Sequence, residues 1–278
     1  MKKTLIALTA AFLMSIQTAV SACTLLAAAG SAVEGGGVLF GKTNDVKFPY
    51  QCKTMLVTDD GFPYYVLRYQ NRKGNFRAQF GINKYGLGIG AAGPGHLSMK
   101  QRTAMKGGNF KSGVWYYLGR CKTVDEALKL PELNNVPANI VLVDSKEIAC
   151  VETFDDGRQK ITRKTNGVLA HTNHYLDPKL FELSKNAINV SSKNRYDRAI
   201  ELLNDGKIPL TFNDFVAFVN DPKIRQYGHV PETVETNASM VIQILPDNDF
   251  KIQFQYKPYA FANKDVLVEL TRKDIFKE

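Results

Sequence analysis

Short apolar runs separated by polar and glycine-containing turns recur through the first half of the chain, and they predict β-strands. Residues 23–29 and 38–42 flank the turn Gly35-Gly36-Gly37, which predicts a hairpin. Further apolar or alternating runs lie between turn-forming residues. They predict strands over residues 54–58, 64–69, 76–82, 87–92, 139–143, 148–154, 158–164, 168–172, 240–245 and 251–256. The pair over 158–164 and 168–172 is expected to complete one central sheet region.

Helical spacing appears in three places. Residues 114–120 are apolar and aromatic, and Thr123 with Glu126 has the spacing of a capping box that opens a short helix. Two amphipathic helices follow from apolar residues at i, i+3, i+4 and i+7: Tyr196, Ala199, Ile200 and Leu203, then Phe212, Phe215, Val216 and Val219. The charged residues 271–278 predict a solvated end. This order of strands and helices predicts an α+β architecture of two sheets covered by helices.

The first 22 residues have the composition of an export signal. Lys2 and Lys3 precede an apolar centre, and the small residues Val20 and Ala22 precede the expected cut. A membrane anchor is the alternative, but the apolar stretch is short for a bilayer, and no later segment approaches the roughly 20 apolar residues needed. Cleavage after Ala22 leaves one domain over residues 23–278, exported to the periplasm or secreted.

Charge and cysteine content narrow the class of protein. The formal charge of +9 loses the two lysines of the leader, which leaves +7 without any block of basic residues. A simple basic surface is therefore expected rather than nucleic-acid binding, and attraction of anionic substrates is the alternative. The spacings of Cys23, Cys52, Cys121 and Cys150 fit no zinc pattern, although one pair can bridge in an oxidising compartment. Cys150 stands in an apolar run and is expected to be an ordinary buried residue.

Cys23 is the strongest candidate for chemistry, because the predicted cut makes it the first residue of the mature chain. A thiolate is the nucleophile, and a free thiol has a pKa near 8.5. The α-amine on the same residue titrates at about 7.7 to 8.0, so it can take the thiol proton and later return it. The alternative is a lipoprotein signal, in which this thiol carries diacylglycerol. Against it, the residues after Cys23 are apolar and favour burial rather than a polar tether.

Six short motifs follow one another in an order that resembles a known family. They are Cys23-Thr24, Gly41-Lys42-Thr43-Asn44-Asp45, Gly81-Ile82-Asn83-Lys84-Tyr85-Gly86-Leu87, Asn139-Ile140-Val141-Leu142-Val143-Asp144, His171-Thr172-Asn173-His174 and Ser192-Lys193-Asn194-Arg195-Tyr196. Together they resemble the N-terminal-nucleophile hydrolases of the linear-amide class. This class includes choloylglycine hydrolases, penicillin V acylases and the acyl-CoA:6-aminopenicillanic acid acyltransferase-like group. The resemblance implies a four-layer αββα sandwich with the nucleophile on the first strand.

The resemblance also implies roles for two residues of the second strand. Asp45 is expected to hold the α-amine, with a simple turn aspartate as the alternative. Lys42 stands where the choloylglycine-type pattern often has arginine. A lysine keeps the positive charge that favours a thiolate but lacks the planar fork of arginine. The other interpretation of Lys42 is a side chain that faces solvent.

Asn173 matches the asparagine that donates to the tetrahedral oxyanion in this family. Such a donor is worth about 2.7 to 4 kcal/mol in other enzymes. Relatives with a second asparagine donor have it after the Gly-Leu motif, where this chain reads Gly90-Ala91-Ala92-Gly93, so either a backbone N–H serves or the oxyanion hole is weaker. His171 and His174 invite a metal assignment, but no convincing third ligand accompanies them.

Arg195 matches the arginine of the family's Ser-x-x-Arg segment. It is placed in the first turn of a predicted helix, where a cation opposes the macrodipole and is locally unfavourable. Such a charge is consistent with retention for a site. Arg198, one turn later, is the alternative, and a solvated arginine is the simplest interpretation.

These inferences favour an exported amidohydrolase that cleaves a linear N-acyl bond through an acyl-thioester on Cys23. Transfer of the acyl group to an amine is a second enzymatic interpretation, and a lipid-anchored binding protein is the non-enzymatic one. The expected partner is a small N-acyl amide. No cofactor, metal, nucleic acid or stable membrane insertion is expected, and a homo-oligomer is compatible with the resemblance. Penicillins, bile-acid conjugates, acyl-homoserine lactones and peptide-like amides all stay open.

Overall fold

The structure, a computed structural model, describes residues 22–46, 51–70, 76–97, 113–131, 137–205, 208–227, 234–259 and 262–277. Residues 1–21 of the predicted export signal lie outside these ranges. No helix within the described residues combines the length and apolar character needed to cross a membrane.

Two antiparallel sheets form the centre of the described chain. The first has six strands in the order β10-β1-β2-β11-β12-β13. Their bounds are Gly167–His171 (β10), Cys23–Ala29 (β1), Val38–Val46 (β2), Glu235–Ile244 (β11), Phe250–Tyr256 (β12) and Val266–Thr271 (β13). Consecutive hairpins link β1 to β2 and β11 to β12, whereas β2 and β11 come together from distant parts of the chain.

The second sheet places seven described strands in sequence order, from β3 to β9. Their bounds are Cys52–Val57 (β3), Tyr64–Gln70 (β4), Phe76–Asn83 (β5), Gly88–Ala92 (β6), Ala138–Val143 (β7), Ile148–Thr153 (β8) and Gln159–Lys164 (β9). Short connections join these neighbouring strands, except for β6 and β7, which residues 93–137 connect.

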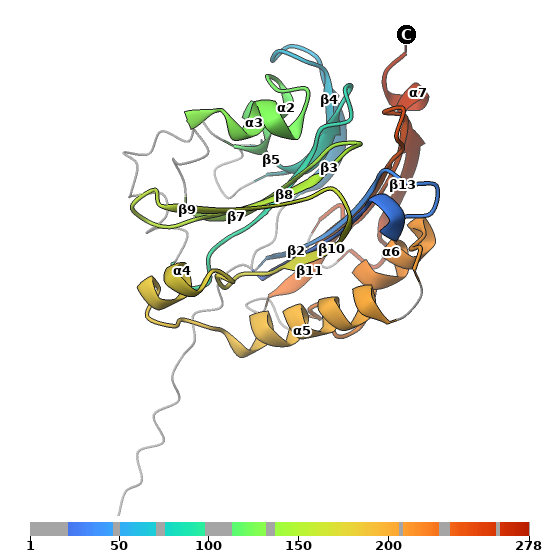
Figure 1. Cartoon of the computed structure of the whole chain (residues 1–278). Coiled ribbons are helices and arrows are strands. Elements are labelled where there is room, and N and C mark those ends of the chain that lie inside the picture. The colour runs from blue at the N-terminus through green and yellow to red at the C-terminus, as the bar shows by residue number, and fades with distance from the viewer. Residues whose placement is uncertain are drawn as a thin grey trace, which may run out of the picture.

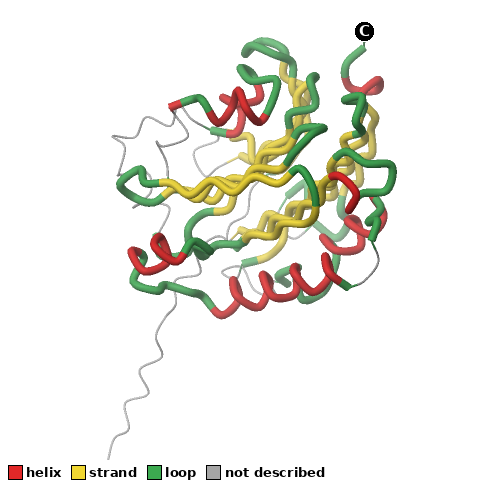
Figure 2. The backbone as a smooth tube through the Cα atoms, in the orientation of Figure 1, coloured by secondary structure: helices red, strands yellow, loops and turns green. Residues whose placement is uncertain are grey.

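Helices cover the outer faces of both sheets (Figure 1). Helices α2 (Val114–Leu118) and α3 (Val124–Leu128) pack on the second sheet through a cluster that includes Tyr117 and Leu142. Helices α5 (Val190–Asn204) and α6 (Phe212–Val219) pack on the first sheet, where Leu203 and Phe215 contact its outward side chains. Figure 2 shows the same four layers as red helices outside yellow strands. The predicted αββα sandwich is confirmed.

The largest apolar cluster lies between the two sheets. In β12 the burial alternates, so that Phe250, Ile252, Phe254 and Tyr256 all point into this space. Each side chain of this size contributes about 1.5 to 3 kcal/mol when it leaves water. The inter-sheet face of β1 carries Cys23 and Leu25, which therefore sit at the edge of the core rather than on the surface.

Most predicted strands and helices occur, and three features differ. Strands β9 and β10 are consecutive in sequence but belong to different sheets, so the expectation of one shared sheet region is wrong. The end of the chain is not a solvated fringe, because Thr271 caps α7 (Arg272–Ile275), and Ile275 and Phe276 are buried in the core. Strand β13 and helix α4 (Pro178–Leu183) had no predicted counterpart. None of the four cysteines, all within the described residues, forms a disulfide.

Candidate active site

The start of β1 and the end of β2 bring the predicted nucleophile and its neighbours together. Cys23 lies opposite Asn44, and Leu25 lies opposite Lys42. Because side chains alternate along a strand, Lys42 and Asn44 share the inter-sheet face with Cys23. Asp45 and Thr24 belong to the opposite face, which the helices cover. The site therefore spans both sides of the first sheet.

Lys42 points at the sulfur of Cys23. Its Nζ lies 3.7 Å from Cys23 Sγ, and it also donates to Thr43 O at 3.2 Å and to Asn44 Oδ1 at 3.3 Å. The Lys42 side chain is fully buried, so the interpretation of a solvent-facing lysine is wrong. Burial lowers the pKa of Lys42, and the nearby Cys23 and Asp45 oppose that shift. An ammonium in this place stabilises a thiolate on Cys23.

A glycine of the second sheet makes room for this lysine. A Cβ on Gly90 of β6 would stand 2.7 Å from Lys42 Cδ and 3.0 Å from Phe40 Cζ. The aromatic ring of Phe80 on β5 lies 4.6 Å from Lys42 Nζ and gives the cation a favourable face. The second sheet thus supplies the opposite wall of the space that Lys42 occupies.

We expect Gly90→Ala to reduce kcat/KM for the proposed substrates by about tenfold or more, because the new methyl displaces Lys42 from the sulfur. It should also destabilise the fold by about 1 to 3 kcal/mol through overpacking. Gly88→Ala is the matched control. Gly88 lies on the same strand as Gly90, and its Cβ would meet Val143 of β7 at 2.8 Å but not Lys42. Kinetics and urea unfolding of both variants separate the two effects, and an equal loss of activity in both would contradict the role of Gly90.

Asn173 and Arg195 converge on the backbone of Cys23. The nitrogen of Cys23 donates to Asn173 Oδ1 at 2.8 Å, and Arg195 Nη2 donates to the same oxygen at 3.0 Å. Arg195 Nη1 donates to Cys23 O at 2.6 Å and to Thr24 Oγ1 at 2.9 Å. Arg195 is 2% exposed, and its guanidinium donates to the start of β1, to Asn173 and to Ser191 Oγ of α5. These contacts fix the plane of the first peptide unit of the strand.

The structure separates the two candidate arginines. Arg198 forms ion pairs with Asp221 at 2.7 Å and Glu201 at 2.8 Å, whereas Arg195 contacts Cys23. The helical argument for Arg195 was wrong, however. Helix α5 begins at Val190, so Arg195 is its sixth residue and not part of the first turn.

Asp45 lies on the helix-covered face, next to Asn44, which pairs with Cys23. Its Oδ1 accepts a hydrogen bond from Thr236 Oγ1 of β11 at 2.6 Å. Burial raises the pKa of Asp45 to about 6, while Arg195, Thr236 and Lys42 act in the opposite direction. Asp45 is thus a buried strand residue rather than a turn aspartate. Its predicted contact with the α-amine stays a prediction.

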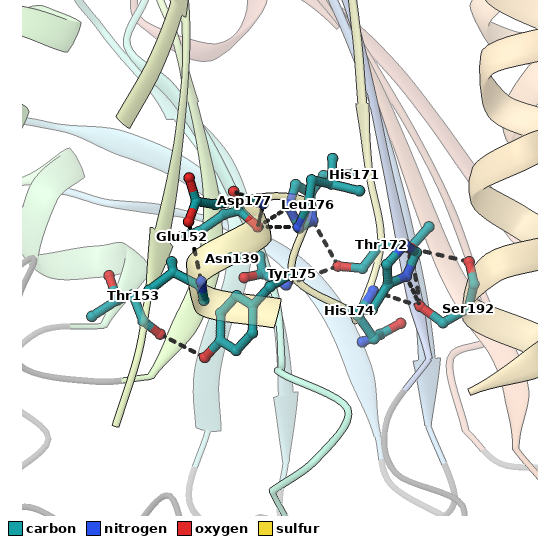
Figure 3. A network of polar contacts seen from close by, with 12 residues as sticks. Asn139, Glu152, Thr153, His171, Thr172, His174, Tyr175, Leu176, Asp177 and Ser192 are labelled. Carbon is teal, nitrogen blue, oxygen red and sulfur yellow. Dashed lines mark hydrogen bonds and ion pairs between the residues drawn. The ribbon is translucent and has the colours of Figure 1, made fainter. Parts of the chain in front are cut away.

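The segment that carries Asn173 is held by a buried polar network, shown in Figure 3. Asn173 N donates to Ser192 Oγ of α5 at 3.0 Å, and the same hydroxyl contacts His174 Nδ1 at 2.9 Å. Asn139 of β7 donates to Thr172 O at 3.1 Å. Asn173 is therefore positioned by one helix and by a strand of the second sheet.

The two histidines next to Asn173 belong to this network. His171 Nε2 lies 3.1 Å from Glu152 Oε1, but the two atoms are not aligned as a hydrogen bond, so the contact is electrostatic only. Glu152 also accepts from the backbone of Leu176 and Asp177. No group of three or more His, Cys, Asp and Glu side chains suited to a metal occurs within the described ranges.

We expect His174 to make the fold sensitive to mild acid. Burial, followed by the nearby His171 and Arg195, lowers its pKa to about 4. An unfolded histidine binds a proton near pH 6.5, which the folded one refuses until about pH 4, so stability falls as the pH drops through this window. The loss is about 2 kcal/mol after allowance for solvent screening.

Urea unfolding of wild type and His174→Gln between pH 7 and pH 4.5 measures this effect. The glutamine variant should lose less stability over the same range. Asp45 acts in the opposite direction, because its raised pKa favours the folded state as the pH falls, but it is present in both proteins. Parallel stability curves for the two proteins would contradict the assignment to His174.

Two residues of the site had no signal in the sequence. Asn237 and Thr236 contact the residues of β2 only because β2 and β11 pair across a long separation in the chain. Asn44 and Ser192 each belong to one of the predicted motifs, but the motifs give them no role. Asn44 stands two residues after Lys42, which places both side chains on one face of a strand, and this spacing is the signal that could have drawn attention to it.

The chain matches the sequence model of one known family. The model of the family described as "Acyl-coenzyme A:6-aminopenicillanic acid acyl-transferase" matches residues 33–254, a range that begins after Cys23. Curated proteins give no match.

Solved structures share the fold at low sequence identity. Penicillin V acylase from Agrobacterium tumefaciens aligns with a TM-score of 0.51 at 17% identity, over 89% of this chain and 86% of the other. A point mutant of conjugated bile acid hydrolase from Clostridium perfringens gives 0.51 at 12% identity, over 89% and 92%. The Caenorhabditis elegans ortholog of N-acylethanolamine-hydrolyzing acid amidase gives 0.54 at 15% identity, over 81% and 93%.

Proposed function

The chain belongs to the acyl-coenzyme A:6-aminopenicillanic acid acyl-transferase family, and on this premise we propose that it is an exported hydrolase of linear amides with Cys23 as its N-terminal nucleophile. The observation that carries the proposal is the convergence of three polar side chains on one residue. The Lys42 ammonium lies at the sulfur of Cys23, while Asn173 and Arg195 hold its backbone. This arrangement is the one expected if Cys23 is the reacting group.

The proposed reaction uses the two groups of a terminal cysteine. The α-amine takes the thiol proton, and the thiolate adds to the substrate carbonyl to give a tetrahedral oxyanion. The carbon–nitrogen bond then breaks, the leaving amine takes the proton from the α-ammonium, and an acyl-thioester stays on Cys23. Water, deprotonated by the amine, adds to the thioester and releases the acid with the thiol restored.

The surrounding side chains suit the charges that this reaction develops. Lys42 offsets the negative charge of the thiolate. The carboxamide of Asn173 carries two hydrogens, so it can donate to Gly93 O, at 2.8 Å, and to the oxyanion together. The nitrogen of Cys23, which becomes the α-amine after cleavage, lies 2.8 Å from Asn173 Oδ1. Asn173 can therefore orient the base and receive the oxyanion with the two ends of one carboxamide.

The names of the structural relatives support amides as the substrate class. They describe an acylase, a hydrolase of conjugated bile acids and an amidase that hydrolyses N-acylethanolamines. Purified mature protein should release amine from at least one member of a panel of penicillins, bile-acid conjugates, acyl-homoserine lactones and peptide-like amides. The absence of amine release from the whole panel, with the Cys23 thiol shown to be unmodified, would count against the proposal.

The family description favours acyl transfer as a second candidate function. The two reactions share the acyl-thioester and differ only in whether water or an amine attacks it. Product analysis with and without a candidate amine acceptor distinguishes them. A new amide that forms at the expense of free acid would indicate a transferase.

A further inference from the structure

Two buried asparagines connect the nucleophile to the interior of the core. Asn44 is 2% exposed and Asn237 is 5% exposed. Asn44 Oδ1 accepts from Lys42 Nζ at 3.3 Å and lies 4.0 Å from Cys23 Sγ. Asn44 Nδ2 donates to Asn237 Oδ1 at 2.9 Å, and Asn237 Nδ2 donates to Cys52 Sγ at 3.1 Å. The result is one directed line of hydrogen bonds from Lys42 to Cys52.

An irregularity in the sheet brings Asn237 into this line. Strand β11 pairs with β2 through Thr236 opposite Asp45 and Ala238 opposite Asn44, so Asn237 is an extra residue between them. Thr236 contacts Asp45 on the helix-covered face, whereas Ala238 belongs to the inter-sheet core. Such a bulge redirects side chains, and bulges occur often beside active sites. Here it allows Asn237 to reach Asn44 from the inter-sheet side.

The line of hydrogen bonds can orient the Lys42 side chain, which is flexible. A lysine ammonium is a compact charge with three donors on a flexible stem, whereas the fork of arginine is planar and preorganised. The three polar contacts of the Lys42 ammonium are Cys23 Sγ, Thr43 O and Asn44 Oδ1. The backbone oxygen is fixed by the strand. The Asn44 oxygen is oriented by the hydrogen bond that Asn237 accepts from the amide end of the same side chain.

We propose that Asn44, held by Asn237, is a positioning residue that directs the Lys42 ammonium onto the sulfur of Cys23. This inference rests on the proposed function in one respect, since it treats Cys23 as the nucleophile. Without the Asn44 oxygen, the ammonium has one acceptor fewer in a buried place and is free to turn toward the ring of Phe80. The thiolate then loses the cation that faces it.

None of the other groups described near the sulfur is placed to direct the Lys42 ammonium as Asn44 is. Asp45 and Arg195 carry the remaining charges that act on Lys42 and Cys23, and their side chains lie on the helix-covered face. Gly90 and Phe80 form the opposite wall and bring no charge. Cys52 at the far end of the line stays a thiol, because burial raises its pKa to about 12.

Alkylation of Cys23 by iodoacetamide, located by peptide mass spectrometry, tests the proposal without any substrate. Hydrogen bonds to charged groups are stronger than those between neutral groups, so Asn44→Leu should slow alkylation at pH 7 by about tenfold or more. In a Lys42→Met background the same substitution should change the rate by less than about twofold, because the cation that Asn44 directs is gone. Asn237→Ala should reproduce the Lys42-dependent loss in weaker form, and it provides the comparison if Asn44→Leu fails to fold.

Two results would overturn the inference. One is an equal fold-change for Asn44→Leu with and without Lys42, which would show that Asn44 acts by another route. The other is an unchanged alkylation rate in both backgrounds. Because alkylation needs no turnover, the coupling can be present in a protein that hydrolyses no amide, in which case only the proposed function fails. An active amidase without the coupling would refute the positioning role alone.

Discussion

Replacement of Cys23 by serine is expected to lower the rate of amide hydrolysis by about a thousandfold or more, because an essential nucleophile has no substitute in the site. The serine hydroxyl ionises far less readily than a thiol, so neither the α-amine nor Lys42 can produce an effective nucleophile from it. The fold should persist. The hydroxyl is smaller than the thiol, so it fits the buried place of Sγ without overpacking the core.

Steady-state kinetics and urea unfolding of Cys23→Ser measure both parts of this prediction. Cys121→Ala is the control, because Cys121 is equally buried but belongs to the cluster under α2 and α3. The control should retain the activity of the wild type. Full activity of Cys23→Ser, or a comparable loss in Cys121→Ala, would remove Cys23 from the role of nucleophile.

One additional residue ahead of Cys23 is expected to reduce turnover by about a hundred- to ten-thousandfold, the range that general acid–base catalysis contributes. The addition converts the basic α-amine into a peptide N–H, which cannot accept a proton. The site itself should survive. Asn173 Oδ1 accepts equally well from a peptide nitrogen, and the contacts of Arg195 with Cys23 O and Thr24 Oγ1 do not involve the terminus.

A protein with one glycine before Cys23 provides this measurement, and a protein with one glycine after Glu278 is the matched control. Alkylation of Cys23 in the extended protein shows whether the thiol is still accessible. If the extended protein were as active as the mature one, the α-amine could not be the base, and Lys42 would be the nearest candidate to replace it.

Most strands and helices could be predicted from local sequence patterns, and the predictions that failed have physical causes. The alternation in residues 251–256 predicts β12 because one face of that strand is buried in the core. Burial also alternates in Val266–Thr271, but the exposed Leu267 interrupts the alternation of apolar and polar residues, so no strand is predicted for β13. Strand β9 pairs locally with β8, whereas β10 joins the other sheet through long-range pairing with β1, which no local pattern encodes.

The site was predicted only in part, because some of its contacts are local in sequence and others depend on long-range packing. Cys23 and the residues on β2 follow from local sequence and from the hairpin that joins the two strands. The position of Arg195 came from the motif alone, since the helix-terminus argument for it did not hold. The roles of Gly90 and Asn237 depend on how β6 and β11 approach β2. The sequence around a glycine or an asparagine does not indicate which distant strand will lie next to it.

Export is proposed to create the catalytic group, so the first residue of the mature protein is the most direct test. Protein isolated from the cell envelope should be analysed by intact mass and by N-terminal sequencing. The account predicts that the chain begins at an unmodified Cys23, with a mass equal to that of residues 23–278. A retained leader, a different first residue or the added mass of a lipid on Cys23 would contradict it.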